Sequence, residues 1–188
     1  MNMLLAATVI GALSAYDATW ESIDSRQNPQ WFEDAKFGIF IHWGTYSVPA
    51  WGPKDRYSEW YWHDLMKEGS PTREFHNKTY GEDFKYQDFA PLWKAEMYDP
   101  ALWADIFAQS GAKYVVLTSK HHEGFCLWPN PQAWNWNAMD IGPHRDLCGD
   151  LITAVHAAGL RMGYYYSIYE WFNPLYKSDV NKYVDQHM

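Results

Sequence analysis

The sequence predicts an α/β fold built on a parallel sheet. Three near-continuous apolar or aromatic runs, at 36–44, 112–120 and 160–167, are typical of strands covered on both faces. Two amphipathic segments, at 99–111 and 146–159, precede the second and third runs. Strands that alternate with helices in this way indicate βα units joined by crossover connections.

The first predicted helix carries its own start and stop signals. Asp99 is a suitable N-cap, and Pro100 occupies the first helical position, where its missing N–H costs nothing. Gly111 ends the helix just before the second strand. An apolar stripe at helical spacing is expected to face the sheet: Leu102, Ile106 and Phe107.

The second predicted helix repeats this design, from Asp146 to a terminating Gly159. Its apolar stripe has four members: Leu147, Leu151, Ile152 and Val155. Each helix passes into its strand within one or two residues. The two segments are therefore a degenerate structural repeat of helix, glycine stop and buried strand.

An open doubly wound sheet and a (β/α)₈ barrel both consist of such units. The residues after the first strand, HWGTYSVPAWG, lack the glycine spacing of a dinucleotide phosphate loop, which favours the barrel. A complete barrel needs about 250 residues, whereas the chain has 188. We therefore expect a (β/α)₈ TIM-like barrel domain at 16–188, incomplete here, with about the first three βα units.

Residues 1–15 are expected to form a signal peptide. The apolar stretch from Met3 to Ala15 has the length of a secretory h-region and is too short for a membrane span. No Lys or Arg precedes it, and a buried first strand or helix is the alternative. Asn77 opens an Asn-Lys-Thr glycosylation acceptor pattern, which agrees with secretion. No later segment is long and apolar enough to span a membrane.

Composition narrows the class of partner. Twelve Trp, fourteen Tyr and nine Phe offer flat apolar faces of the kind that pack on sugar rings, although a ligand-free aromatic core explains them too. The net charge of −8, without a Lys/Arg cluster, argues against nucleic acid and anionic membranes. Cys126 and Cys148 are either a disulfide or two buried thiols, and we favour the thiols.

Polar and aromatic residues gather where the predicted strands end. The residues concerned are His42 on the first strand, His121 and His122 on the second, and Tyr165 and Tyr166 on the third. The carboxyl ends of barrel strands carry the chemistry of that fold, and neutral imidazoles can donate to and accept from sugar hydroxyls. Adjacent His121 and His122 share a pocket only if the backbone bends, which Gly124 permits. Alternatively, one of the two packs outward against a helix.

A metal site is the rival interpretation of the same residues. His42, His121 and His122, with Glu59 or Glu123, form a conceivable zinc-ligand set of a metal-dependent hydrolase. The sequence has no histidine pair at i, i+4 on a helix and no cysteine cluster, and the tryptophan-rich surroundings suit a sugar better. We therefore expect no metal and no other cofactor.

Several motifs in order resemble the amino-terminal part of α-L-fucosidases of glycoside hydrolase family 29, nearest to the animal lysosomal type. The motifs are FGIFIHWG, SEWYW, KHHEGF, WNWNAMDIGPHRDL and GYYYSIYEWFNPLY. The resemblance extends from about Trp31 to Tyr176. It implies a fucose-binding set: His42, Glu59, Trp60, His121, His122 and Tyr166. Tyr165 is the alternative to Tyr166 at the third strand.

The resemblance also implies an activity. The family removes terminal α-L-fucose from glycoproteins, glycolipids and oligosaccharides with retention, using an Asp nucleophile on the fourth strand and a later acid/base. We expect that nucleophile beyond Met188, together with the rest of the barrel and a C-terminal β-sandwich. No catalytic residue is assigned in this chain, which on its own is expected to be inactive. The implied location is lysosomal or secreted, and the implied partners are fucosylated glycans. A non-catalytic fucose-binding protein is the alternative function.

Overall fold

The computed structural model describes residues 16–171 and 173–187, which divide into two compact units at Lys36/Phe37. The described residues of the first unit, 16–36, contain two short helices, α1 (Trp20–Asp24) and α2 (Gln30–Ala35). The hydroxyl of Thr19 caps α1 by accepting from the backbone N–H of Ser22. The predicted signal peptide at 1–15 lies outside the described residues, and it stays a prediction.

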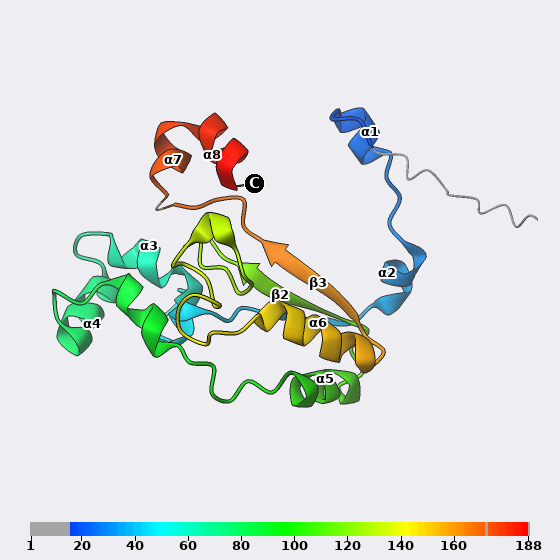
Figure 1. Cartoon of the computed structure of the whole chain (residues 1–188), viewed down its shortest axis with the longest axis horizontal. Helices are drawn as coiled ribbons and strands as arrows, with labels where there is room; N and C mark the ends of the chain where they lie inside the picture. Colours follow the sequence, from blue (N-terminus) through cyan, green and yellow to red (C-terminus); the bar gives the residue numbers. More distant parts are fainter. Residues whose placement is uncertain (1–15, 172, 188) are drawn as a thin grey trace, which may run out of the picture. The chain divides into compact units, whose positions relative to one another are not determined.

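The second unit is built on a parallel three-stranded sheet with the order β1-β2-β3 (Figure 1). The strands are β1 (Gly38–Ile41), β2 (Tyr114–Lys120) and β3 (Arg161–Tyr166). All three predicted strands are present, each shorter than its apolar run. The predicted α/β class is therefore confirmed.

Helices α5 (Pro100–Gln109) and α6 (Leu147–Ala157) precede β2 and β3 and run alongside the sheet in Figure 1. The Asp99 carboxylate accepts from two N–H groups of the first turn of α5, each at 3.0 Å. Asp146 caps α6 in the same way, accepting from the Gly149 N–H at 2.8 Å. Both predicted caps are thus confirmed, because the signals that set them lie within one turn of sequence.

The main core lies between these helices and one face of the sheet. Val115 and Leu117 of β2 are fully buried there, and so are Leu147, Leu151 and Val155 of α6. Three of the four residues of the predicted stripe of α6 therefore face the sheet, and the fourth, Ile152, is only half-buried. Alternate residues of β2 point to this helix-covered face, and the others point to the opposite, open face.

The predicted stripe of α5 is wrong in two of its three members. Leu102 and Ile106 are 54% and 53% exposed, whereas Ala104 and Phe107 are buried. Trp103 packs against the core beside them. The helix turns its aromatic side inward, because an aromatic ring buries more apolar area than an aliphatic side chain does.

The long connection from β1 to α5 builds a second, aromatic cluster from Tyr46, Tyr61, Tyr86 and Phe89. Its elements are η1 (Thr45–Ser47), η2 (Ser58–Trp60), α3 (Tyr61–Leu65), α4 (Pro71–Tyr80) and η3 (Tyr86–Leu92). The remaining elements are η4 (Pro131–Ala133), before α6, and α7 (Pro174–Ser178) and α8 (Val180–His187), after β3. Among the described helices, none has the length and apolarity needed to cross a bilayer.

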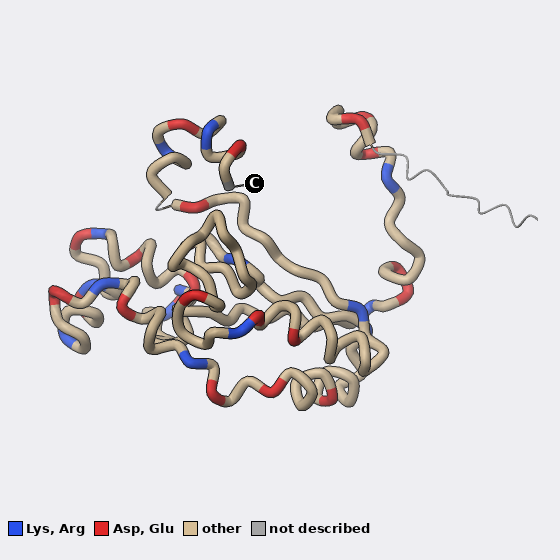
Figure 2. Tube along the Cα trace, in the orientation of Figure 1, with Lys and Arg blue, Asp and Glu red and all other residues tan. Residues whose placement is uncertain are grey.

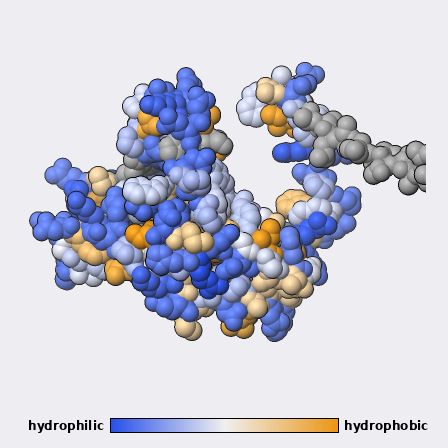
Figure 3. All heavy atoms as spheres, viewed as in Figure 1, coloured by the Kyte–Doolittle hydropathy of each residue, from blue (hydrophilic) through white to orange (hydrophobic). Residues whose placement is uncertain are grey.

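Charges of both signs are interspersed along the trace of the second unit (Figure 2). The face seen in Figure 3 is mostly hydrophilic, with apolar residues scattered among the polar ones. The predicted lack of a nucleic-acid partner rests on this charge pattern and stays a prediction. Cys126 and Cys148 are two separate buried thiols, as favoured from the sequence.

Candidate functional site

A β-bulge shapes the end of the central strand. Thr118 of β2 pairs with Tyr165 of β3, but the next residue of β3, Tyr166, pairs with Lys120. Ser119 is therefore an extra residue without a counterpart on β3. Bulges of this kind re-aim the side chains that follow them, and they are common beside active sites.

The bulge changes which face the following side chains occupy. Ser119 lines a cavity with Tyr164 and Tyr166 on the helix-covered face. Lys120 lies on that face too, because its Nζ donates to the Tyr166 hydroxyl at 3.2 Å. His121 consequently returns to the open face of the sheet. If the same sequence continued as a regular strand without a bulge, strict alternation would send His121 toward the helices with Val115, Leu117 and Ser119.

The chain leaves the sheet directly after Lys120. The N–H of Gly124 donates to the carbonyl of His121 at 3.0 Å, closing a turn around His122. Gly124 has a φ of +84°, a conformation that L side chains rarely adopt. The expected bend at Gly124 is confirmed, and it brings the rings of His121 and His122 to a centroid distance of 4.3 Å.

Rings from all three strand ends converge on the open face. The centroid of His121 lies 5.4 Å from that of His42 and 6.0 Å from that of Tyr165. His42 and Tyr165 are 6.1 Å apart, and Phe40 lies 4.9 Å from His42. The carboxyl ends of β1, β2 and β3 therefore present one continuous set of polar and aromatic rings.

The structure does not place Tyr166 in this set. Its ring lies on the helix-covered face, where Lys120 Nζ sits 4.4 Å from the ring centroid and Trp128 lies 6.0 Å away. Tyr165, the alternative register, takes the place beside the histidines. The alternation of side chains along β3 separates the two tyrosines, and the pairing of Tyr165 with Thr118 fixes which one faces the site.

Two tryptophans form a wall beside His122. Trp60 of η2 lies 5.9 Å from His122, and Trp171 lies 4.3 Å from both Trp60 and His122. The backbone N–H of Trp171 donates to the His122 carbonyl at 3.2 Å, which holds the segment after β3 against the turn. Trp171 was not among the predicted binding residues. Its signal in the sequence is only that it follows closely on the third strand.

Burial favours the uncharged form of two histidines of the cluster, His122 and His42. Burial lowers the pKa of His122 to about 4, with contributions from His121 and His42. Burial also lowers the pKa of His42, and the nearby Glu59 carboxylate opposes this shift only in part. Neutral rings can both donate and accept hydrogen bonds, as the recognition of sugar hydroxyls requires.

The Glu123 carboxylate is not exposed to solvent beside the ring cluster. It is buried, with Oε2 3.6 Å from Nδ1 of His121, which is longer than a hydrogen bond. Burial raises the pKa of Glu123. Within the described ranges, no three His, Cys, Asp or Glu side chains gather into a potential metal site.

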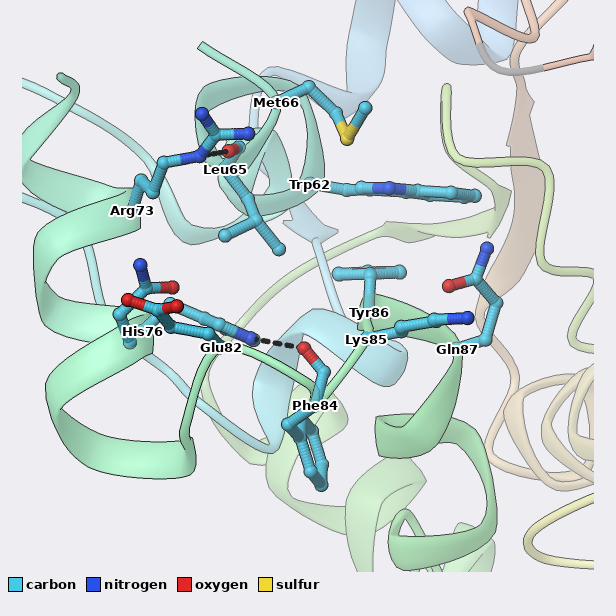
Figure 4. Close-up of a pocket in the computed structure, with 11 residues that line it drawn as sticks. Trp62, Leu65, Met66, Arg73, His76, Glu82, Phe84, Lys85, Tyr86 and Gln87 are labelled. Carbon is cyan, nitrogen blue, oxygen red and sulfur yellow. Dashed lines mark hydrogen bonds between the residues drawn. The ribbon is translucent and has the colours of Figure 1, made fainter. Parts of the chain in front are cut away.

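A separate cavity of about 410 Å³ lies among α3, α4 and η3 (Figure 4). The ring of Trp62 forms one wall, and Nε2 of His76 donates to the Phe84 carbonyl below it. The proposed glycosylation residue Asn77 lies on α4, half-buried at the edge of this cavity. No predicted fucose-binding residue lines the cavity, and it is distinct from the ring cluster.

A family model described as α-L-fucosidase matches residues 3–188. The chain belongs to the α-L-fucosidase family. Two human relatives are similar to this fucosidase-family chain: tissue α-L-fucosidase is 52% identical over 174 residues, and plasma α-L-fucosidase is 54% identical over 166 residues. These matches cover 92% and 87% of the chain, respectively.

Solved structures of α-L-fucosidases also resemble the fold of this chain. The crystal structure of Thermotoga maritima α-fucosidase in complex with fucose matches 84% of the chain with a TM-score of 0.78 and 51% identity. A bacterial α-L-fucosidase from Bacteroides thetaiotaomicron matches 82% of it with a TM-score of 0.63. The fucosidase-family chain spans 36% and 34% of the two human relatives and 39% of the Thermotoga chain.

Proposed function

We propose that this chain is the amino-terminal part of the (β/α)₈ catalytic barrel of a retaining α-L-fucosidase. Its three parallel strands and two covering helices would be the first βα units of that barrel. The observation that carries the proposal is the convergence of His42, His121 and Tyr165 at the carboxyl ends of adjacent strands. Family membership supports fucose as the sugar, because a polar ring cluster alone does not identify one.

The proposed pocket has a floor and a wall. The imidazoles of His42, His121 and His122 form the floor and bind the hydroxyls of fucose. Trp60 and Trp171, 4.3 Å apart, form the wall that packs against the apolar edge of the sugar. Glu59, on η2, adds an acceptor close enough to His42 to oppose, in part, the lowering of the His42 pKa by burial.

Hydrolysis with retention requires two carboxyl groups about 5–5.5 Å apart, a nucleophile and an acid/base. We assign neither role to Glu59 or Glu123. Glu123 is buried against His121, and Glu59 lies beside His42 in the binding set. In the proposed whole enzyme, the nucleophile is an Asp on the strand that follows β3. The substrates of that enzyme are glycans with a terminal α-L-fucose.

Fucose binding tests this proposal directly. Calorimetric titration of the chain with L-fucose should give saturable binding, and His121→Ala should abolish it. His156→Ala is the matched control, because His156 is an exposed residue on α6 and should not matter. Binding that survives His121→Ala, or no binding at all, would overturn the assignment of the pocket.

Binding without catalysis is the second candidate function. One observation favours it. The described part of the site consists of groups suited to binding, and its carboxylate Glu123 is buried against His121. Release of a chromogenic aglycone from an α-L-fucoside separates the two candidates. Turnover by a longer protein that contains this chain supports the hydrolase, and binding without turnover supports the lectin-like alternative.

We also propose a lysosomal or secreted location. The support is the apolar stretch from Met3 to Ala15 and the Asn-Lys-Thr pattern on α4, where Thr79 is exposed. Expression in animal cells tests it. An amino-terminus near Ala15 and a mass decrease on treatment with an N-glycosidase are expected, and an intact, unglycosylated cytosolic product would contradict the proposal.

A further inference from the structure

The side chain of Ser167 takes part in two hydrogen bonds at the end of β3. Its Oγ lies 2.8 Å from the carbonyl oxygen of Tyr169 and 2.5 Å from Nδ1 of His122. Ser167 is only 2% exposed, so water does not compete for either bond. A carbonyl oxygen only accepts, and a serine hydroxyl has a single proton. That proton is therefore donated to Tyr169.

This arrangement determines where His122 carries its own proton. With the hydroxyl proton committed to Tyr169, the oxygen of Ser167 offers only lone pairs to His122. Nδ1 of His122 must then be the donor. In a neutral imidazole one ring nitrogen is protonated and the other is not, so Nε2 is left as an acceptor. Burial, which lowers the pKa of His122 to about 4, keeps the ring neutral at pH 7.

We propose that Ser167 is a positioning residue that holds His122 in the Nδ1–H tautomer, so that Nε2 presents a hydrogen-bond acceptor to the bound sugar. The ring of His122 lies within 4.3 Å, centroid to centroid, of both His121 and Trp171. Among the described residues none makes a hydrogen bond to Nε2 of His122, which leaves this atom for the ligand. Ser167 itself does not touch the sugar.

The tautomer has a consequence for specificity, which rests on the proposed function. An unprotonated Nε2 repels another lone pair, and the nearby Glu59 carboxylate is likewise an acceptor when ionised. The pocket therefore selects ligands that offer O–H donors at these positions. A neutral sugar with free hydroxyls fits, whereas a carboxylate or phosphate at the same place is rejected.

Nuclear magnetic resonance reads the tautomer in the ligand-free chain. Long-range ¹H–¹⁵N spectra of histidine-labelled protein distinguish a protonated Nδ1 from a protonated Nε2. The chain has eight histidines, and the signals absent from the His122→Gln variant identify this one. We expect the Nδ1–H pattern at pH 7 in the wild type and a shift toward the Nε2–H pattern in Ser167→Ala.

Ser119→Ala is the matched control. Ser119 is also buried, and its hydroxyl also donates to a strand carbonyl, that of Tyr165 at 2.9 Å, but it has no hydrogen bond to a histidine. This variant should keep the Nδ1–H pattern of His122. An Nε2–H pattern in the wild type, or an unchanged pattern in Ser167→Ala, would overturn the proposal. The wild-type spectrum alone shows which nitrogen of His122 is protonated, even if Ser167→Ala does not fold.

Binding measurements test the specificity. Deoxyfluoro analogues of L-fucose, one per hydroxyl, keep an acceptor at each position but lose the donor. At least one should bind about tenfold more weakly than L-fucose, as expected for a lost buried hydrogen bond. Equal affinity for all analogues would refute the acceptor role of Nε2. Failure of L-fucose itself to bind would refute the proposed function, while the tautomer in the free chain would stand or fall on its spectrum.

Discussion

The ammonium group of Lys120 lies 2.6 Å from the Glu170 carboxylate, and the lysine side chain is only 1% exposed. Burial alone would lower the pKa of Lys120, but the hydrogen bond and charge of Glu170 outweigh it and leave the pKa raised. The Glu170 carboxylate also accepts from the Asn173 side chain at 2.7 Å. The pair thus connects the end of β2 to the segment that carries Trp171.

Breaking this ion pair from one side should be costly. Lys120→Met leaves Glu170, which is only 13% exposed at its side chain, without its cation. We expect a loss of about 3–5 kcal/mol in the free energy of unfolding. Urea denaturation followed by tryptophan fluorescence measures it. The double variant Lys120→Met/Glu170→Gln should recover part of the loss, and a Lys120→Met variant as stable as wild type would contradict the prediction.

Stability should fall as the pH is lowered through the acidic range. The pKa of His122 is about 4 in the folded chain against an ordinary value of 6.5. Between these values the unfolded chain binds a proton at His122 that the folded chain does not bind. The contribution of His122 is therefore fully present above about pH 6.5 and is lost as the pH falls toward 4.

Comparison with His122→Gln isolates this contribution from those of the carboxylates. Unfolding free energies measured from pH 7 to pH 4 should fall more steeply in the wild type than in the variant. Parallel curves would show that the ring titrates alike in both states, and the assigned shift would be wrong.

Two glycines with similar backbone angles should respond differently to alanine. Gly142 and Gly111 have φ values of +83° and +87°. A Cβ on Gly142 would lie 2.6 Å and 2.7 Å from two carbonyl oxygens, whereas nothing lies within 4 Å of one on Gly111. Gly111→Ala should cost about 1–2 kcal/mol for the left-handed conformation alone. Thermal unfolding should show a clearly larger loss for Gly142→Ala, and equal losses would disprove the steric argument.

The features that were predicted correctly from sequence are local ones. A helix cap such as Asp99 depends on neighbours within one turn, and an apolar run such as that around Val115 reports burial by itself. The positions of His42 and His121 followed from topology, because parallel strands end at the same edge of a sheet. These inferences needed no knowledge of which residue pairs with which.

The features that were missed depend on pairing and packing. The bulge at Ser119 is a mismatch between two strands, so neither strand reveals it alone, and the choice between Tyr165 and Tyr166 depends on it. The inward face of α5 was misjudged because helical periodicity is satisfied by the stripe of Ile106 as well as by that of Phe107. Only contacts with the sheet decide between them.

The order of the strands affects how the sheet can form while the chain is being synthesised. Each strand pairs with the one synthesised just before it, so the sheet β1-β2-β3 can be laid down in step with translation. Among the three strands that the structure describes, none waits for a partner from a more distant part of the polypeptide. His42 and His121 can therefore meet on a nascent chain before Tyr165 leaves the ribosome, and the ring cluster becomes a template on which later segments assemble.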